Sequence, residues 1–394
     1  MAATDEPLEA FRAEARAWLD ENYPAALRSG DEDELTEARK AWTSAICSRG
    51  WATPSWPKEY GGGGLSLAEA DVLRQEMRRI GASNPIAGGM GVRMLGPTLL
   101  EYGTEAQKLE HIPRITRGES RWCQGYSEPN AGSDLASLQT RAEDKGDHFL
   151  VNGQKIWTSG ANFADWCFCL VRTDTTRKHE GISFLLIDMR SPGVEVRPIQ
   201  LISGNSPFCE TFFRDVTVPK ANLVGEINRG WTIGKRLLQF ERQRGDDRPP
   251  ANNIEGRPVQ VIAREYVGVD DTGALADGDL RSRLTNHLME MRALVLTLKR
   301  VAAARGANGP STTTSILKNV SSKVSQDRAE LVVEILGADG LGWEGEAFTK
   351  EELDAVRQWL SGKATTIYAG SWEVQYNIIS KRILGLPDPS SNAS

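Results

Sequence analysis

Hydrophobic positions change their spacing twice along the 394-residue chain, from a helical period to a strand-like one and back. In the first 120 residues they recur at every third or fourth position, which is typical of amphipathic helices. The first such face consists of Leu8, Phe11, Ala15 and Leu19. Further helices are predicted over residues 33–49, 66–80, 93–102 and 105–117. A loop rich in proline and glycine is expected over residues 51–64.

Residues 121 to about 225 contain short runs of Val, Ile, Leu and Phe separated by turn residues, and such runs predict strands. The runs are HFLVNG, WCFCLVR, GISFLLID, VEVRPI and ETFFRDVTV. From Trp231 onward the helical period returns, first at Leu284, Leu288, Met291, Val295, Leu298 and Ala302, then at Ile316, Val320 and Val324. We therefore expect three domains, helical over residues 1–120, β over residues 121–228 and helical over residues 229–394.

Charge and composition exclude several classes of protein. The net charge of −6 comes from 47 basic and 53 acidic residues without a long run of either sign, so nucleic-acid binding has no electrostatic support. No apolar stretch approaches the roughly 20 residues of a membrane helix, and the N-terminus resembles neither a signal nor a transit peptide. Five scattered cysteines suit reduced thiols, and no histidine cluster is apparent. We therefore expect a cytoplasmic protein without membrane insertion or a metal site.

Three segments carry the candidate chemistry, namely residues 122–134 (WCQGYSEPNAGSD), 152–160 (NGQKIWTSG) and 367–375 (IYAGSWEVQ). With residues 56–61 (WPKEYG) and 215–219 (DVTVP), they resemble the acyl-CoA dehydrogenase family in order and spacing, over nearly the whole chain. The resemblance implies an N-terminal α-helical domain, a middle antiparallel β-barrel and a C-terminal four-helix bundle. It also implies bound FAD and an oligomer, either a homotetramer or a homodimer, with a mixed oligomer as an alternative.

The first two segments are expected to hold the flavin. A loop with a rigid proline and a small glycine can bring backbone N–H groups close to a flavin edge or a pyrophosphate. The resemblance assigns cofactor contacts to Gln124, Tyr126, Ser127, Gly132 and Ser133 in the first segment, and to Trp157, Thr158 and Ser159 in the second. Trp157 would lie against the flavin, and the hydroxyl of Ser159 would donate to flavin N5. Ser133 would also contact the substrate.

The third segment departs from the family, because Ala369 stands where many members have the glutamate that serves as catalytic base. Some relatives carry the base in the helix after the barrel, immediately before an arginine, and here that pair is Glu241-Arg242. Glu241 is therefore the predicted base and Arg242 a substrate contact. A carboxylate in a closed pocket has a raised proton affinity, which suits removal of an α proton beside a thioester. Tyr368, Ala369 and Gly370 would contact the thioester.

Two other stretches complete the expected site and differ from common relatives. Residues 243–253 (QRGDDRPPANN) cannot continue a helix, and this break is expected to reshape the acyl pocket. The Arg and Gln that many relatives direct at the FAD pyrophosphate have no clear counterpart near residues 280–284. On the adenine side the resemblance assigns Glu334, Gly337 and Ala338, and near the C-terminus it assigns Ser371 and Glu373.

The expected function is α,β-dehydrogenation of an acyl-CoA, with electrons passed to an electron-transfer flavoprotein. Two alternatives stay open because of Ala369. One is other flavin chemistry on a CoA thioester, as in an oxidase or a desulfinase. The other is a non-catalytic subunit of a mixed oligomer. The identity of the acyl group does not follow from these motifs.

Overall fold

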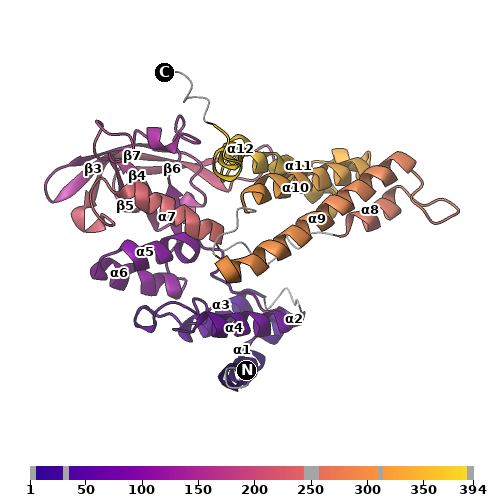
Figure 1. The fold of residues 1–394 in the computed structure, drawn as a ribbon, viewed down its shortest axis with the longest axis horizontal. Coiled ribbons are helices and arrows are strands. Elements are labelled where there is room, and N and C mark those ends of the chain that lie inside the picture. Colours follow the sequence, from indigo (N-terminus) through magenta and orange to yellow (C-terminus); the bar gives the residue numbers. More distant parts are fainter. Residues whose placement is uncertain (1–5, 30–34, 244–256, 309–313, 388–394) are drawn as a thin grey trace. The chain divides into compact units, whose positions relative to one another are not determined.

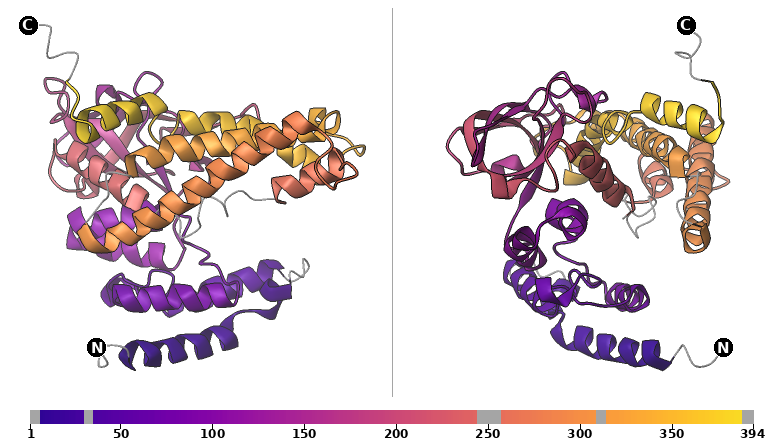
Figure 2. Two further views of the ribbon diagram at one scale, coloured as in Figure 1. Left: turned by 45° about the vertical axis from the view of Figure 1, so that its right-hand side comes forward. Right: turned by 60° about the vertical axis from the view of Figure 1, so that its left-hand side comes forward.

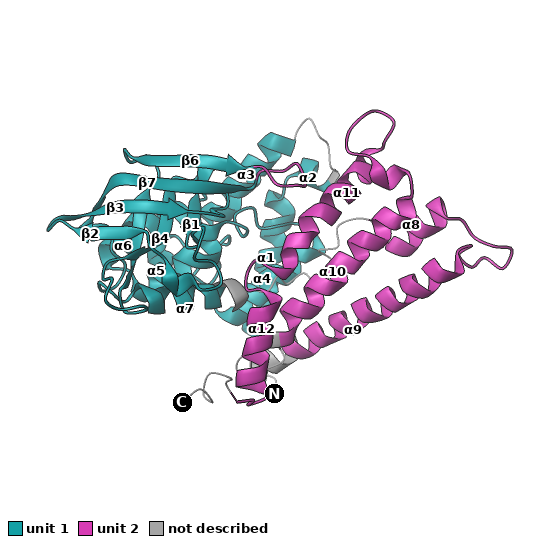
Figure 3. Cartoon of the chain, turned by 90° about the horizontal axis from the view of Figure 1, so that it is seen from above, with its two compact units in different colours: residues 1–199, 207–244 teal, residues 200–206, 245–394 magenta. Residues whose placement is uncertain are grey.

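The computed structural model describes residues 6–29, 35–243, 257–308 and 314–387. Contacts within the chain divide it into two compact units (Figure 3). Unit 1 comprises residues 1–199 and 207–244, and unit 2 comprises residues 200–206 and 245–394. The seven residues 200–206 lie between two strands of unit 1 in the sequence but pack with unit 2.

Unit 1 begins with helices whose bounds follow the sequence periodicity. They are α1 (Glu6–Asn22), the short α2 (Ala25–Ser29), α3 (Leu35–Ser48), α4 (Leu67–Arg79), α5 (Gly96–Tyr102) and α6 (Glu105–Thr116). The side chains of Ser66 and Thr104 each accept a hydrogen bond from the N–H three residues later, and their own N–H groups donate to the side chain of that residue, which fixes where α4 and α6 start. The predicted face of α1 is confirmed, since Phe11, Ala15 and Leu19 are buried, and α1 packs against α4 in the indigo region of Figure 2.

One curled sheet follows in unit 1 (Figure 1). Its strands are β1 (Trp122–Gly125), β2 (Arg141–Asp144), β3 (His148–Lys155), β4 (Trp166–Arg172), β5 (Ile182–Asp188), β6 (Val194–Ile199) and β7 (Phe208–Pro219). The order is β1-β4-β2-β3-β7-β6, with β5 paired to β4. The five hydrophobic runs are therefore confirmed as strands, namely β3 to β7. The two that the pattern missed are β1, which lies inside a motif, and β2, in which only Ala142 is buried.

The prediction of an antiparallel barrel needs one correction. The pairs β2/β3, β3/β7, β4/β5 and β6/β7 are antiparallel, but β1 and β2 both run parallel to β4. Neither β1 nor β2 is joined to β4 by a hairpin, because the chain makes the 128–140 loop between β1 and β2 and then β3 before it reaches β4. The sheet is accordingly mixed and curled.

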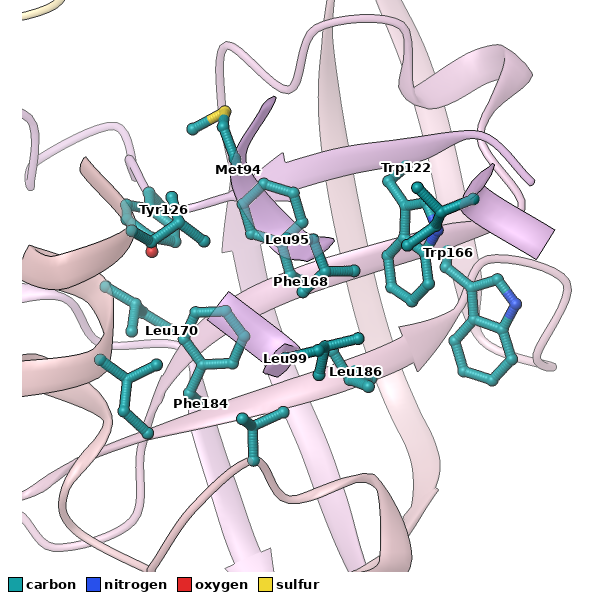
Figure 4. Packing of buried hydrophobic residues seen from close by; sticks show 14 of the residues in the cluster. Met94, Leu95, Leu99, Trp122, Tyr126, Trp166, Phe168, Leu170, Phe184 and Leu186 are labelled. Carbon is teal, nitrogen blue, oxygen red and sulfur yellow. The ribbon is translucent and has the colours of Figure 1, made fainter. Parts of the chain in front are cut away.

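A single apolar core joins β1, β4 and β5 to helices η2 (Gly91–Leu95), α5, α6 and α7 (Gly230–Gln243). Figure 4 shows part of this cluster, in which Leu95 and Leu99 face Phe168, Phe184 and Leu186. Helix α7 approaches the sheet closely through its glycines. A Cβ at Gly230 would lie 2.2 Å from the carbonyl carbon of Ser183, so a side chain there would displace the helix.

Unit 2 consists mainly of α8 (Val259–Tyr266), α9 (Gly278–Asn308), α10 (Thr314–Leu336) and α11 (Lys350–Gly362), followed by the shorter α12 (Trp372–Ile378). The predicted helical C-terminal region is thereby confirmed. Helix α10 is central, because α8, α9, α11 and α12 all pack against it (Figure 3). Leu284 and Val324 are buried, whereas Ile316 and Val320 stay partly exposed. The predicted break follows α7, which ends at Gln243, but residues 244–256 lie outside the described part.

Among the helices that the structure describes, none is both long and apolar enough to cross a membrane.

A buried histidine, His111, is expected to make the stability of unit 1 sensitive to acid. Its ring is 2% exposed and lies edge-on against Trp122 and Trp166, at centroid distances of 5.2 and 4.9 Å. Burial disfavours the charged imidazolium and lowers the pKa of His111.

We therefore expect the melting temperature to be highest above the unfolded-state pKa of histidine, about 6.5, and to fall below it. The reason is that unfolded His111 takes up a proton at a pH where the folded residue does not. A His111→Gln variant should lose less stability than wild type between pH 7 and pH 5 in scanning calorimetry. The control His179→Gln removes an exposed imidazole and should keep the wild-type pH dependence. An unchanged pH dependence in His111→Gln would contradict the assignment.

Candidate functional site

The first motif forms a tight turn after strand β1. Glu128 and Ala131 exchange two backbone hydrogen bonds of 3.1 and 3.0 Å, with Pro129 and Asn130 at the corners. Proline and asparagine suit such corners, because one fixes φ and the other tolerates unusual backbone angles. The turn presents Gly132 and Ser133 at the surface, and a Cβ built at Gly132 would meet no atom within 4 Å. The open glycine lets a ligand approach the backbone closely.

A buried ion pair joins this turn to the second motif. The ammonium of Lys155, which is 0% exposed, donates to Glu128 Oε1 at 2.8 Å and to the Tyr126 carbonyl at 3.0 Å. The Glu128 carboxylate also accepts the backbone N–H groups of Gln139 (2.6 Å) and Thr140 (2.8 Å). Burial disfavours ionised Glu128, but Lys155 and the N–H donors outweigh burial and hold the pKa of Glu128 below its usual value. The start of the turn is therefore fixed to β3.

Trp157 stands out in the second motif because its indole is turned outward. It follows β3 with a positive φ of 62°, and its side chain is 52% exposed with one edge against Phe208. A left-handed backbone costs a non-glycine residue about 1–2 kcal/mol, so the surrounding structure must hold it in place. Part of that support is the hydrogen bond from Ile156 N–H to the Ser127 carbonyl, 2.9 Å long.

The two hydroxyls after Trp157 differ in availability. Thr158 is fully buried, and its hydroxyl contacts the Cys209 carbonyl and the Thr211 hydroxyl, both at 2.8 Å. The Thr158 hydroxyl is therefore already hydrogen-bonded to strand β7. Ser159 is half-buried, and its hydroxyl has no partner among the residues that the structure describes. Of the two, Ser159 is the one that can donate to a ligand.

The remaining predicted contacts of unit 1 that the structure describes are buried or half-buried. Gln124 and Ser127 are half-buried. Tyr126 is 5% exposed, and its ring meets Phe168 edge-on at 6.1 Å, so the phenol belongs to the core shown in Figure 4. Glu241 and Arg242 occupy the last turn of α7, but their side chains lie outside the described part.

The adenine-side residues of unit 2 lie at the C-terminal end of α10. Glu334 pairs with Arg283 of α9, with an Oε1–Nη1 distance of 2.8 Å. Arg283 lies in the stretch 280–284, where the sequence offered no clear contact to the FAD pyrophosphate. Its partner is 51 positions away, so the local sequence pattern could not predict the pair. Gly337 ends the helix with φ +56°, and both Gly337 and Ala338 are exposed. The carboxylate of Glu334 and the exposed turn at Gly337 and Ala338 therefore lie together at the C-terminal end of α10.

The third motif is a second strained turn, just before α12. Ala369 has a left-handed φ of 53° and Gly370 follows at 89°. Ser371 caps α12 by accepting the Val374 N–H at 3.4 Å, and hydrogen bonds from the backbone N–H of Glu373 itself and from the Ser371 hydroxyl lower the pKa of Glu373. Tyr368 is 51% exposed, with the Lys318 ammonium 4.7 Å from its ring centroid. The N–H of Ala369 has no acceptor among the described residues.

These residues fit a flavin. An outward indole, a free hydroxyl at Ser159 and an open turn at Gly132 match an aromatic ring system with a polar chain. The geometry given above describes the residues of each unit within that unit alone.

Three family profiles match the chain in succession. "Acyl-CoA dehydrogenase, N-terminal domain" matches residues 5–119, "Acyl-CoA dehydrogenase, middle domain" matches residues 123–216, and "Acyl-CoA dehydrogenase, C-terminal domain" matches residues 262–384.

Individual relatives and solved structures agree with these profiles. Acyl-CoA dehydrogenase IpdE1 of Mycobacterium tuberculosis is 37% identical over 396 residues, which cover 96% of this chain and 98% of the relative. The ChsE4–ChsE5 complex from Mycobacterium tuberculosis contains a chain that is 30% identical, with a TM-score of 0.72 and coverage of 98% and 100%. The Tcur3481–Tcur3483 steroid ACAD contains one that is 32% identical, with a TM-score of 0.72 and coverage of 97% and 98%.

The Lys155–Glu128 pair should be necessary for both folding and flavin retention. We expect Lys155→Met or Glu128→Gln alone to destabilise unit 1 by about 3–5 kcal/mol, because each leaves a buried charge or its donors unpaired. Both variants should also lose flavin. The double variant should recover part of the stability, since neither charge then remains.

Denaturant titration followed by tryptophan fluorescence gives the stability, and visible absorbance gives the flavin content. The matched control is Lys178→Met, which breaks an exposed pair with Asp134 at 3.0 Å and should cost at most about 1 kcal/mol. If Lys155→Met cost no more than Lys178→Met, the buried pair would not have the role assigned to it.

Proposed function

The chain belongs to the acyl-CoA dehydrogenase family, and from this premise we propose that it binds FAD and oxidises an acyl-CoA thioester to the 2-enoyl-CoA. The observation that carries the proposal is the pair of motifs fixed by Lys155 and Glu128. Together they present the Trp157 indole and the free Ser159 hydroxyl at one end of β3. The relatives of the chain support an FAD-dependent acyl-CoA dehydrogenase, and the roles of single residues are proposed here.

Glu241 is proposed as the base that removes the α proton. Ala369 has no ionisable side chain, so the position where many family members carry the base cannot supply one here. Helix α7 carries Glu241 in its last turn, and the close contact of Gly230 with Ser183 fixes the start of that helix on the sheet. Arg242 is proposed to hold the carboxylate or to contact the substrate.

The other proposed roles concern charge and orientation. The N–H of Ala369 would donate to the thioester carbonyl, where negative charge grows as the α proton leaves. Its left-handed backbone turns the N–H without any contribution from the side chain. The Ser159 hydroxyl would donate to flavin N5, Trp157 would cover the ring and exclude water, and Ser133 would contact the thioester. Bound FAD would supply the acceptor for the β hydrogen, which leaves as hydride.

The remaining contacts of the proposal concern cofactor, acceptor and assembly. Gln124, Ser127 and Gly132 would line the flavin through backbone groups, while Glu334, Gly337 and Ala338 would contact the adenine side. Electrons would pass to an electron-transfer flavoprotein, and the protein would act as an oligomer.

One alternative has an observation in its favour. Two of the similar structures are named for two different chains, ChsE4–ChsE5 and Tcur3481–Tcur3483. Combined with Ala369, these names favour a mixed oligomer, in which this chain is either the catalytic subunit or its supporting partner. A supporting subunit would stay colourless after purification, alone and in complex.

The base assignment is tested by Glu241→Gln. We expect anaerobic mixing with a substrate acyl-CoA to bleach the wild-type flavin, and the variant to do so about 10²–10⁴-fold more slowly, because an amide cannot accept the proton. Stopped-flow absorbance of the flavin band is the measurement. Glu226→Gln changes an exposed glutamate just before α7 and should bleach like wild type. Equal rates for Glu241→Gln and wild type would show that another residue is the base.

The role of the Ser159 hydroxyl is tested by Ser159→Ala. Loss of one hydrogen bond to the developing charge should slow flavin reduction roughly tenfold to a hundredfold and leave flavin content near wild type. Ser191→Ala, in the turn between β5 and β6, is the control and should reduce at the wild-type rate. A variant that retains the full rate would remove Ser159 from the proposed chemistry.

A further inference from the structure

Unit 2 contains a cavity of about 460 Å³ that none of the residues assigned above lines. It lies between α8, the C-terminal half of α10 and the start of α11. Apolar side chains form one side of it, namely Ile262, Val332, Leu336 and Ala355. A cavity with such a wall favours a ligand that has an apolar body.

Charged residues form the other side, and almost all of them have partners inside unit 2. Arg257 pairs with Glu265 and, at 3.5 Å, with Glu351. Lys350 pairs with Asp354 at 2.6 Å. These pairs leave the charges of the cavity rim compensated.

Arg328 is the exception. Its side chain lines the cavity and is only 9% exposed. Nη2 donates to the Arg257 carbonyl at 2.9 Å, but no carboxylate among the described residues lies within 4 Å of the guanidinium. Burial accordingly lowers the pKa of Arg328, with only partial relief from Glu351. A buried cation without a counter-charge is costly, and the guanidinium has further N–H groups to offer.

We propose that this cavity binds a small monocarboxylate with a branched or short apolar body, held by Arg328. One unpaired positive charge calls for a single negative charge, and a guanidinium matches a carboxylate with two parallel hydrogen bonds. The apolar wall would pack against the hydrocarbon part of the ligand. Inorganic phosphate lacks such a body and fits the cavity less well.

The test is isothermal titration calorimetry of the purified protein, flavin included, with three probes. 4-Methylpentanoate should bind, whereas its neutral isostere 4-methylpentanamide and inorganic phosphate should bind at least tenfold more weakly. The visible flavin spectrum should not change at saturation with 4-methylpentanoate, since the cavity is separate from the residues assigned to the flavin. Equal binding of the amide or of phosphate, or a perturbed flavin spectrum, would overturn the proposal.

Variants assign the binding to Arg328. Arg328→Met should weaken 4-methylpentanoate binding roughly tenfold to a hundredfold, because a charge-assisted hydrogen bond is lost. The control Arg264→Gln changes an exposed arginine of α8 and should bind like wild type. Full binding by Arg328→Met would overturn the proposal. If Arg328→Met does not fold, Arg328→Lys keeps the charge but not the fork and should bind more weakly than wild type. If Arg328→Lys bound 4-methylpentanoate as tightly as wild type, the proposed contact between the guanidinium and the carboxylate would be overturned.

Discussion

The site depends first on the ion pair between Lys155 and Glu128. Each residue lies in a different motif, and their contact inside the sheet turns two separate segments into one surface. A buried pair stabilises little by itself, because desolvation offsets most of the attraction. Its effect here is to fix the position of the turn, since the Glu128 carboxylate also accepts hydrogen bonds from the N–H groups of Gln139 and Thr140. Any arrangement that separated the motifs would leave charge and donors unpaired.

The sequence predicted the class of each region and the three motifs, but not the features that give the motifs their shape. Hydrophobic period sufficed for α1, α3 and β3 to β7, where apolar residues meet a core. It failed for β2, whose residues are mostly exposed. The outward indole of Trp157 depends on a positive φ that no propensity favours. The pairing of Arg283 with Glu334 joins two helices and depends on the packing of α9 on α10.

The left-handed turn at Ala369 and Gly370 shows that backbone shape and side-chain chemistry can be separated. A turn of this kind is easier for glycine or asparagine than for alanine, yet the chain keeps it without a carboxylate at Ala369. What the turn retains is an N–H without an acceptor among the described residues. In the proposed mechanism the N–H of Ala369 therefore polarises the thioester carbonyl, while Glu241 of α7 accepts the α proton.

Residues 200–206 have a consequence for dissecting the protein. They are bounded by β6 and β7, but they pack with unit 2, where a Cβ at Gly204 would lie 3.0 Å from Trp343 Cζ2. A fragment that stops after α7 would keep this loop and lose the indole that it packs on. A fragment that starts at α8 would keep the indole and expose it. Cutting the chain at one place thus cannot yield two intact halves, because the loop and the indole always end up in different fragments.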